Sequence, residues 1–370
     1  MTRRERFLAI LGKQRADTIT WAPNFDHWLN VNRANDTVPA EFDGMSRNDI
    51  VRAVDATIWA RTGVLRSERP NVRVRREEDP GKTIRTVYET PVGCVETLHR
   101  YAGDLTHALF LTEHMVKRVE DIEVAKFIAA DTTYTLDVEP FLESERDVGD
   151  DGISLVGLPT CVPFIQFGKT DAGWVNGIYL WHDHPREVEA LLEVYTAKNV
   201  EAARLLADSP CKVIQSGDNM DEWTMPPNLF ERYAVPYYRR ISAILHEAGK
   251  ILQGHWCGRT KRLLPLVPDT GIDVVEAFAS APMADLTVAE ALDALRGKVV
   301  LQGGIPSILM CEQGGTRDDL RRYVDELLRT VPIGEWFVIG MGDNVPPDAD
   351  FERVKIISQM VNALEPVSPG

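Results

Sequence analysis

The chain is short of positive charge. Its 370 residues carry 41 Lys and Arg against 56 Asp and Glu, a formal net charge of −15 at pH 7. Nucleic acids and anionic membranes select for basic patches, so this balance argues against both as partners. No run of about 18 apolar residues could span a bilayer, and the start of the chain lacks the apolar region of about 7–15 residues that makes a secretory signal. We therefore expect a cytoplasmic protein with neither nucleic acid nor membrane as partner.

Cysteine is also scarce, and its number is odd. The five residues are scattered along the chain at Cys94, Cys161, Cys211, Cys257 and Cys311. A disulfide framework needs paired cysteines in an oxidising compartment, so this pattern favours reduced thiols. Four of the five are expected to fill the core, and Cys257 alone has a chemical argument.

Boundaries between domains are missing as well. The sequence has no low-complexity stretch, no linker rich in Pro, Gly or Ser, and no repeat of about 20–50 residues. Length alone suggests either two domains or one barrel with insertions. Hydrophobic residues make up 44% of the chain, which is enough for a sizeable core. We predict a single domain over residues 1–370.

The first 150 residues mix helical and β patterns. Apolar residues recur at helical spacing in Thr2–Leu11 and in Ser46–Ala60, and a short β-prone run, Thr18–Trp21, lies between them. Two alternating runs then flank a turn at 79–82, and a third follows, which predicts a β-hairpin insertion over 72–98. Helices are expected over 113–129 and 135–145.

From residue 150 onward, apolar runs alternate with amphipathic helices. The predicted strands are Ile153–Leu158, Lys212–Ser216, Ile251–Gly254, Ile272–Ala277, Val299–Gly303 and Trp336–Ile339. The helices begin near Pro185, Pro227, Thr260, Thr287 and Thr316, and a last helix spans Asp350–Leu364. This alternation predicts a parallel sheet covered by helices. With one or two earlier strands the count approaches eight, so an α/β fold of the (β/α)8 TIM-barrel type is favoured, with an N-terminal helical extension. No G-x-G-x-x-G supports a dinucleotide fold.

Polar residues follow several of these strands, where a barrel places its active site. His255 and Cys257 lie two residues apart after one strand, so in an extended chain both side chains point the same way. An imidazole and a thiolate can share a zinc ion, and they suit zinc better than magnesium or calcium. The alternative is a buried cysteine beside a hydrogen-bonded histidine at a strand end.

Three carboxylates at other strand ends allow two interpretations each. Glu276 ends an apolar strand, where an unpaired carboxylate is costly to bury, so it needs a metal, a cation or a water-filled pocket. Asp218 directly follows a strand and is either a site residue or a turn and cap residue. Asp343 lies between Gly342 and Asn344, and its local pattern favours a turn.

Aromatic residues cluster after the first strand. Trp21, Phe25 and Trp28 surround Asn24 in this segment. Most aromatic side chains belong to the core, but these four residues could also wall a substrate pocket at the barrel mouth.

These motifs together resemble the uroporphyrinogen decarboxylase superfamily and, within it, the corrinoid-dependent methyltransferases. The resemblance covers nearly the whole chain. Its parts are the opening helix, Gly217-Asp218 followed by 225–230 and Pro236, the H-x-C-G strand end at 255–258, the strand and loop at 299–306, and the last strand end at 339–347. Gly304 replaces an Asn of the family pattern. The resemblance implies a (β/α)8 barrel.

The resemblance also implies a zinc site. In the methyltransferases the ligands are the His and Cys of H-x-C and a Cys in the last motif. His255 and Cys257 match the first two, but the third position falls on Asp343, a departure from the pattern. Carboxylate is an acceptable zinc ligand, so Asp343 could replace the thiolate directly. Otherwise Glu276 could reach in as the third ligand, or zinc could be absent.

The implied reaction is methyl transfer from a small methylated substrate to the cobalt of a separate corrinoid protein. The corrinoid (cobalamin) must come from this partner because the chain lacks the D-x-H-x-x-G signature. An oxygen-rich ligand set and the nearby aromatic residues favour an aromatic methyl ether, and hence O-demethylation. Asp218 or Glu276 could deliver a proton to the leaving oxygen. A homodimer is left open.

Three other functions stay open. Methyl transfer from a methylcorrinoid to a small thiol of the coenzyme M type would use the same site. A decarboxylase is less favoured, because the segment after the first strand has no arginine to clamp a porphyrin carboxylate. The last alternative is a non-catalytic member that binds a ligand or a corrinoid protein.

Overall fold

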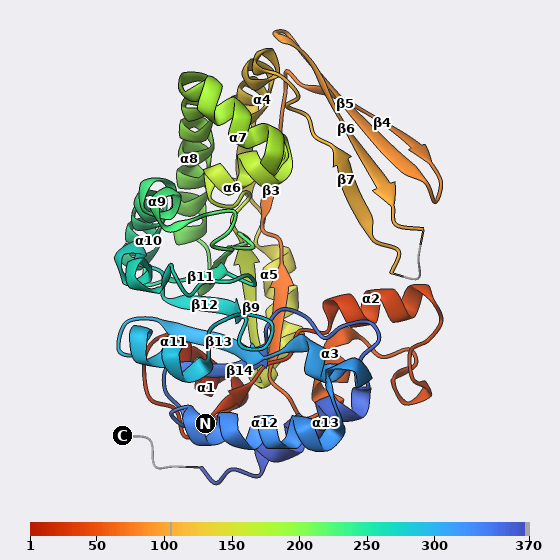
Figure 1. The fold of residues 1–370 in the computed structure, drawn as a ribbon, viewed down its shortest axis with the longest axis vertical. Coiled ribbons are helices and arrows are strands. Elements are labelled where there is room, and N and C mark those ends of the chain that lie inside the picture. The colour runs from red at the N-terminus through yellow and green to blue at the C-terminus, as the bar shows by residue number, and fades with distance from the viewer. Residues whose placement is uncertain (104–105, 367–370) are drawn as a thin grey trace. The chain divides into compact units, whose positions relative to one another are not determined.

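The computed structural model describes residues 1–103 and 106–366 (Figure 1). Its contacts divide into two compact units. Unit 1 comprises Met1–Gly63, Val138–Gly157 and Pro210–Gly370, and unit 2 comprises Val64–Asp137 and Leu158–Ser209. The single domain expected over 1–370 stays a prediction. Among the described residues, none of the helices combines the length and the apolar character that a membrane span requires.

Unit 1 is built on an eight-stranded, all-parallel sheet. In the order of the sheet the strands are β1 (Thr20–Trp21), β14 (Phe337–Met341), β13 (Val300–Ile305), β12 (Val274–Phe278), β11 (Ile251–His255), β10 (Val213–Ser216), β9 (Gly152–Gly157) and β2 (Ile58–Thr62). The two end strands approach each other, because the Thr57 N–H donates to the Trp21 carbonyl at 2.8 Å. The predicted (β/α)8 barrel is therefore confirmed, and each strand predicted after residue 150 lies within two residues of its observed position.

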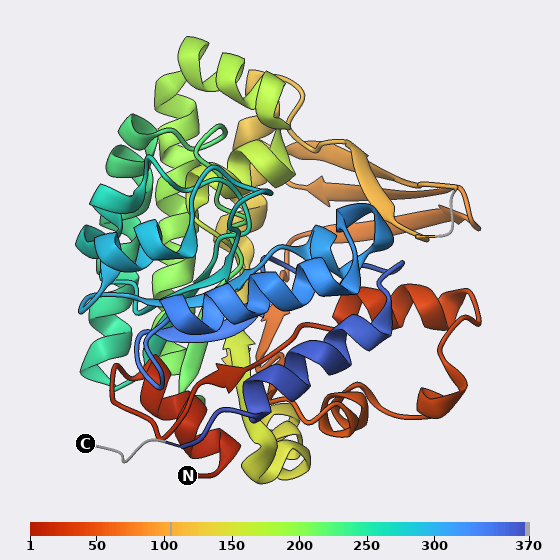
Figure 2. The same cartoon turned by 60° about the horizontal axis from the view of Figure 1, so that its bottom comes forward.

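Helices lie before, between and after the strands of unit 1. They are α1 (Arg3–Leu11), α2 (Asp26–Ala34), α3 (Arg47–Ala53), α5 (Glu139–Val148), α9 (Pro227–Leu229), α10 (Val235–Glu247), α11 (Val288–Leu295), α12 (Arg317–Thr330) and α13 (Phe351–Asn362). Short 3-10 turns lie at 40–42, 149–151, 264–270, 307–310 and 312–314, and a π-turn at 230–234. Four of the helices begin at capping boxes, whose first residues are Thr2, Ser46, Thr287 and Thr316. Helices α12 and α13 pack side by side (Figure 2).

Two helix predictions in unit 1 were wrong in part. The helix expected over Ser46–Ala60 ends at Ala53, and β2 begins at Ile58. Asp55 has a φ of 57°, which ends the helical path and turns the chain into the barrel. The helix expected near Thr260 is a 3-10 segment, Leu264–Thr270, because its two prolines remove backbone donors.

The barrel interior changes from apolar to polar along the strands. At the N-terminal end lies a shared core layer, Val213, Ile251, Val274, Val300 and Val338, which α1 closes with Phe7, Ile10 and Leu11. Two residues further along, the alternation of each strand brings buried polar side chains to the same face, namely Gln215, Gln253, Glu276 and Gln302. The amide of Gln253 donates to Gln302 at 3.2 Å. The N-terminal half of the barrel interior is therefore packed with apolar side chains, and the polar side chains lie towards the C-terminal ends of the strands.

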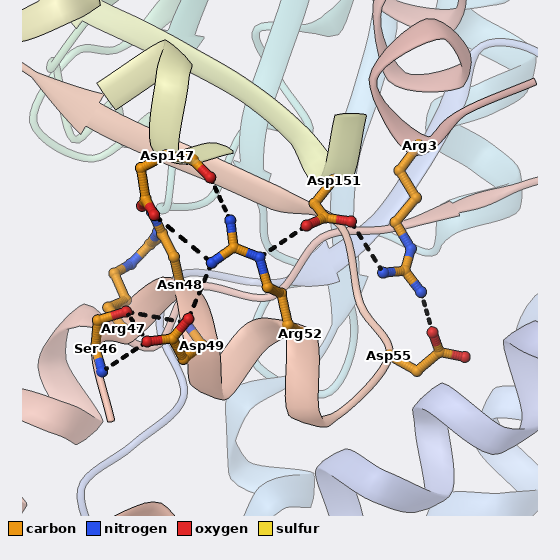
Figure 3. A network of polar contacts seen from close by, with 9 residues as sticks. All are labelled: Arg3, Ser46, Arg47, Asn48, Asp49, Arg52, Asp55, Asp147 and Asp151. Carbon is orange, nitrogen blue, oxygen red and sulfur yellow. Dashed lines mark hydrogen bonds and ion pairs between the residues drawn. The ribbon is translucent and has the colours of Figure 1, made fainter. Parts of the chain in front are cut away.

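A polar network joins α1, α3 and the turn before β9 (Figure 3). Arg52 donates to Asp151 at 2.7 Å and lies 3.7 Å from an oxygen of Asp147. Arg3 pairs with Asp55 and is 3.9 Å from Asp151. Exposed ion pairs contribute little individually, so this network fixes the N-terminal helices rather than supplying much stability.

Unit 2 combines two antiparallel sheets with helices. The sheets are β3 (Leu65–Glu68) with β8 (Thr133–Leu136), and β4 (Arg73–Asp79), β5 (Thr83–Thr90), β6 (Gly93–Tyr101) and β7 (Leu109–Glu113). The helices are α4 (Val119–Asp131), α6 (Pro163–Ile165), the π-helical turn Gln166–Asp171, α7 (Trp174–Asp183) and α8 (Pro185–Ala207). The predicted hairpin over 72–98 is confirmed and extended by β7 (Figure 1). The helices expected over 113–129 and 135–145 begin later, at Val119 and at Glu139, the latter being α5 of unit 1.

Among the described residues of unit 2, the buried carboxyl group is that of Asp171, which is 1% exposed. Burial raises its pKa from the usual 3.8 to about 7, against the neighbouring Tyr195 hydroxyl and the Gln166 amide, which lower it. The unfolded chain thus releases this proton near pH 4 and the folded chain only near pH 7. The stabilising contribution is complete below pH 4 and is lost as the pH rises to about 7.

The variant Asp171→Asn should lack this pH dependence. Between pH 4.5 and pH 8 the wild type should lose about 3 kcal/mol of unfolding free energy relative to the variant. Urea unfolding of both proteins at the two pH values measures the difference. Asp183→Asn, at an exposed carboxylate on α7, is the control and should track the wild type. A constant difference between Asp171→Asn and wild type would contradict the prediction.

Candidate functional site

Two neighbouring strands and the loop after a third bring the central groups together. His255 ends β11 and is in register with Glu276 of β12, so both face the barrel interior. The Nδ1 atom of His255 lies 2.7 Å from Oε2 of Glu276. Its Nε2 atom lies 3.7 Å from Oδ1 of Asp343, in the loop after β14. The imidazole thus has one carboxylate on each nitrogen.

Glu276 is held firmly by its surroundings. It is 2% exposed, and its Oε2 also accepts a hydrogen bond from Gln215 Nε2 at 3.0 Å. These two partners compensate the burial cost that the sequence alone left unexplained. The register shifts after Glu276, where Ala277 has a φ of 61°. Such bulges re-aim side chains beside functional sites, and here the bulge directly follows the carboxylate.

The charges at this site are strongly coupled. Burial by itself would lower the pKa of His255, but the Glu276 carboxylate and a hydrogen bond with Cys257 raise it to about 10. Partial burial raises the pKa of Asp343 above its usual value, against the opposing charge of His255. The side chain of Asp343 is 43% exposed and that of His255 is 12% exposed. The site therefore opens to solvent on the Asp343 side.

Trp256, between His255 and Cys257, holds this segment in place through a buried side chain. Trp256 is 1% exposed, and its indole N–H donates to the Tyr238 hydroxyl at 3.1 Å. The indole folds back against Gly254, where a Cβ atom would lie 2.5 Å from Trp256 Nε1. No other residue type would fit there without displacing the tryptophan. Cys257 itself is partly exposed.

Asp218, a predicted catalytic residue, accepts a hydrogen bond from the same Tyr238 hydroxyl that binds Trp256. Tyr238 donates from its hydroxyl to Oδ2 of Asp218, and Ser216 donates to Oδ1 at 2.8 Å. Asp218 is 0% exposed. A group without solvent contact cannot meet substrate as placed here, so the structure gives Asp218 a supporting position. Its catalytic role stays a prediction.

The three aromatic side chains that were expected to line a substrate pocket are buried. Trp21, Phe25 and Trp28 are each 2% exposed or less. Phe25 and Trp28 pack against Phe351 with ring centroids 5.5 and 4.6 Å away, and the Trp21 indole donates to Ser358 of α13. These rings fill a core between α2 and α13 instead of lining an open surface. Hydrophobic partners supplied by α13, far along the sequence, explain the difference.

Asn24, in the same segment, is also buried, but part of its side-chain amide is unpaired among the described residues. It is 1% exposed, and its Oδ1 accepts from the Asp26 N–H at 3.1 Å. Its Nδ2 atom has no hydrogen-bond partner among the described residues. The substrate-binding role predicted for Asn24 therefore stays a prediction.

Arg61 was missed by the sequence analysis. It lies in β2 on the interior face, two residues after Trp59, and its guanidinium is 4.6 Å from the centroid of that ring. Its charge also helps to hold down the pKa of Asp343. The expected helix over Ser46–Ala60 hid this strand, and with it the arginine. The sequence signal for this strand was the short apolar run 58–60, followed by Arg61 and ended by Gly63.

The donor set has the chemistry of a zinc site, although the described residues contain no group of three His, Cys, Asp or Glu side chains already arranged around a metal. Metal-binding histidines typically donate the other ring nitrogen to a carboxylate, as His255 does to Glu276. Two ligands of a tetrahedral zinc are about 3.3–3.6 Å apart, close to the His255–Asp343 distance of 3.7 Å. The residues fit zinc through Nε2, with Glu276 as the orienting partner.

Comparisons with known proteins agree with this architecture. A model of the uroporphyrinogen decarboxylase (URO-D) family matches residues 112–364. A uroporphyrinogen decarboxylase from Arthrobacter sp. (strain FB24) is 25% identical over 154 residues, covering 41% of this chain and 42% of that protein. The methylcobamide:CoM methyltransferase MtbA of Methanosarcina mazei is 25% identical over 179 residues, covering 47% of this chain and 51% of that protein. The chain thus spans about half the length of these relatives or less.

A solved structure extends the comparison to nearly the whole chain. A methyltransferase from Methanosarcina mazei superposes with a TM-score of 0.60 at 13% identity and covers 98% of both chains. At this identity the likeness supports the barrel fold.

Proposed function

Because the chain belongs to the uroporphyrinogen decarboxylase family, we propose that it is a methyltransferase acting with a separate corrinoid protein. In this proposal His255, Cys257 and Asp343 hold zinc, and the methyl group of a small substrate moves to the corrinoid cobalt. The observation that carries the proposal is the orientation of His255, with Glu276 on Nδ1 and Asp343 on the Nε2 side. The match to a methyltransferase among the relatives supports it.

Each residue has a defined task. Bound zinc would supply a Lewis acid that stabilises the negative charge of a leaving oxygen or sulfur. Glu276 accepts a hydrogen bond from Nδ1 of His255 and fixes the ring, so that zinc would bind at Nε2 in place of the proton there. Since Oε2 of Glu276 already takes two donors, we assign it to orientation rather than to proton delivery. Asp343 replaces the thiolate expected at the third position.

Two features of the site bear on the substrate. The oxygen-rich ligand set favours an aromatic methyl ether, and therefore O-demethylation, although the aromatic wall no longer adds support. Arg61 places a cation on the interior face near Asp343, which favours a substrate with one anionic group. The second candidate is transfer from a methylcorrinoid to a small thiol, favoured by the match to a methylcobamide:CoM methyltransferase.

One assay distinguishes these functions. Zinc-loaded protein is mixed with cob(I)alamin and 4-methoxybenzoate, and the cobalt spectrum reports methylation. In parallel, methylcobalamin is mixed with coenzyme M, and loss of the methylcobalamin spectrum reports transfer to the thiol. We expect the first reaction, about one zinc per chain, and no turnover without corrinoid. Decarboxylation of uroporphyrinogen, or spectra unchanged in both mixtures, would overturn the proposal.

Replacing the orienting carboxylate should weaken zinc binding without removing a ligand. For Glu276→Gln we expect a loss of about 10–100-fold in zinc affinity, because a neutral amide no longer fixes the imidazole. Competition with a chromogenic chelator measures the affinity. Asp343→Ala is the matched comparison and should lose more, since it removes a ligand. If Glu276→Gln loses more affinity than Asp343→Ala, Glu276 is the third ligand instead.

A further inference from the structure

Unit 2 contains a cavity of its own, separate from the residues discussed so far. It has a volume of about 120 Å³, and its polar lining includes Arg69, Tyr134, Gln166, Asp171, Tyr195 and Lys198. All of its lining residues belong to unit 2. An engineered cavity of about 150 Å³ holds benzene, so this one accepts about five or six non-hydrogen atoms.

The floor of the cavity carries an unsatisfied acceptor. Gln166 and Asp171 are the first and last residues of the π-helical turn, whose wide spacing sets both on one side. Gln166 Nε2 donates to Oδ1 of Asp171 at 3.0 Å, and Cys161 Sγ donates to the Gln166 amide oxygen at 3.8 Å. Oδ2 of Asp171 is buried and has no hydrogen-bond partner among the described residues.

Such a group is costly in a folded protein unless something binds it. A buried acceptor without a donor loses hydration and gains nothing in exchange. Short π-helical segments occur frequently at functional sites, because an extra residue in a helix is otherwise unfavourable. The unpaired oxygen points to a ligand that donates a hydrogen bond to Asp171, and the π-helical turn sets Gln166 on the same side of the cavity.

The remaining lining residues define the other end of that ligand. Tyr134 and Tyr195 add aromatic rings, which attract an ammonium group. Arg69 donates to Thr132 at 2.9 Å, and its charge opposes the rise in pKa that burial causes at both tyrosines, so it lies close to them. Lys198 is a second cation of the lining, paired with Glu201 at 2.8 Å. The cavity therefore offers a carboxyl group, aromatic rings and cationic side chains within a small volume.

We propose that this cavity binds a small zwitterion of the α-amino acid class, about the size of glycine or alanine. Its ammonium group donates to Oδ2 of Asp171 and lies against the tyrosine rings, and its positive charge favours the ionised form of that carboxyl group. Its carboxylate pairs with Arg69. No covalent step is involved, and the site does not depend on the methyltransferase proposal.

Calorimetric titration of the whole protein at pH 8, where the Asp171 carboxyl group is ionised, tests the proposal with three probes. L-alanine carries both charges, ethylamine only the positive one, and acetate only the negative one. We expect alanine to bind with a dissociation constant below about 1 mM, within the efficiency that a ligand of this size can reach. Ethylamine and acetate should each bind at least about tenfold more weakly. Absence of alanine binding at 10-fold higher concentrations, or equal binding of ethylamine, would overturn the proposal.

Variants locate the binding. Asp171→Asn should weaken alanine binding at least about tenfold, whereas Asp183→Asn, at an exposed acid of α7, should leave it unchanged. Arg69→Gln provides a second test at an exposed side chain and should weaken alanine but not ethylamine binding. His255→Ala should bind alanine like the wild type, which separates this site from the barrel. Unaltered binding in both Asp171→Asn and Arg69→Gln would place the ligand elsewhere.

Discussion

Cys257→Ala is expected to abolish stoichiometric zinc binding and to lower methyl transfer by at least about 100–1000-fold. A metal Lewis acid contributes several kcal/mol to stabilising a developing negative charge, and each 1.4 kcal/mol corresponds to a factor of ten in rate. The thiolate is the soft member of the proposed set, and it selects zinc over magnesium or calcium. Metal analysis of the dialysed variant and the cob(I)alamin assay measure the two effects.

The thiol control for this prediction is Cys94→Ala. Cys94 is exposed on β6 in unit 2, so the core position expected for it was wrong, and it is in register with Glu89 across the hairpin. It should keep about one zinc and full activity, because it contributes no ligand. Chelation of the wild type should reproduce the Cys257→Ala phenotype, and added zinc should restore only the wild type. Zinc retained at wild-type stoichiometry in Cys257→Ala would reject the assigned ligand set.

The sequence allowed the barrel and the H-x-C segment to be predicted for one physical reason. Strands β10 to β14 are buried on both faces, so they appear as apolar runs between amphipathic helices. His255 and Cys257 follow such a run directly, and their common direction needs only the period of an extended chain. The pairing of His255 with Glu276 adds register between neighbouring strands, which alternation alone cannot supply.

Elsewhere, local pattern and tertiary structure disagree. Ile50, Val51, Val54 and Ile58 recur at helical spacing, yet Ile58 begins a barrel strand because Asp55 turns the chain. This single turn hid Arg61. From the sequence alone, Phe25 and Trp28 could line a pocket or belong to a core. They belong to a core because they pack against Phe351, which is more than 300 residues away in the sequence. Long-range partners of this kind have no local signature.

Tyr238→Phe is expected to destabilise the protein by about 3–5 kcal/mol and to weaken zinc binding. The hydroxyl that is removed donates to the buried carboxyl group of Asp218 and accepts from the Trp256 indole. A buried polar group that loses its partner costs about 1–3 kcal/mol, and more when it is charged. Trp256 lies between the two ligands of the H-x-C segment, so its release should also loosen them. Urea unfolding and chelator competition measure the two effects.

A double-mutant cycle tests whether the chain from Asp218 to Trp256 acts as one unit. Asp218→Asn alone removes the charge, and in the pair with Tyr238→Phe the costs should be less than additive by about 0.5–3 kcal/mol. Tyr179→Phe, at an exposed ring, is the control and should change neither quantity. A catalytic Asp218 would instead make Asp218→Asn inactive with its zinc affinity intact. Because Asp218 has no exposed surface and supports Tyr238, we expect zinc affinity and activity to fall together in this variant.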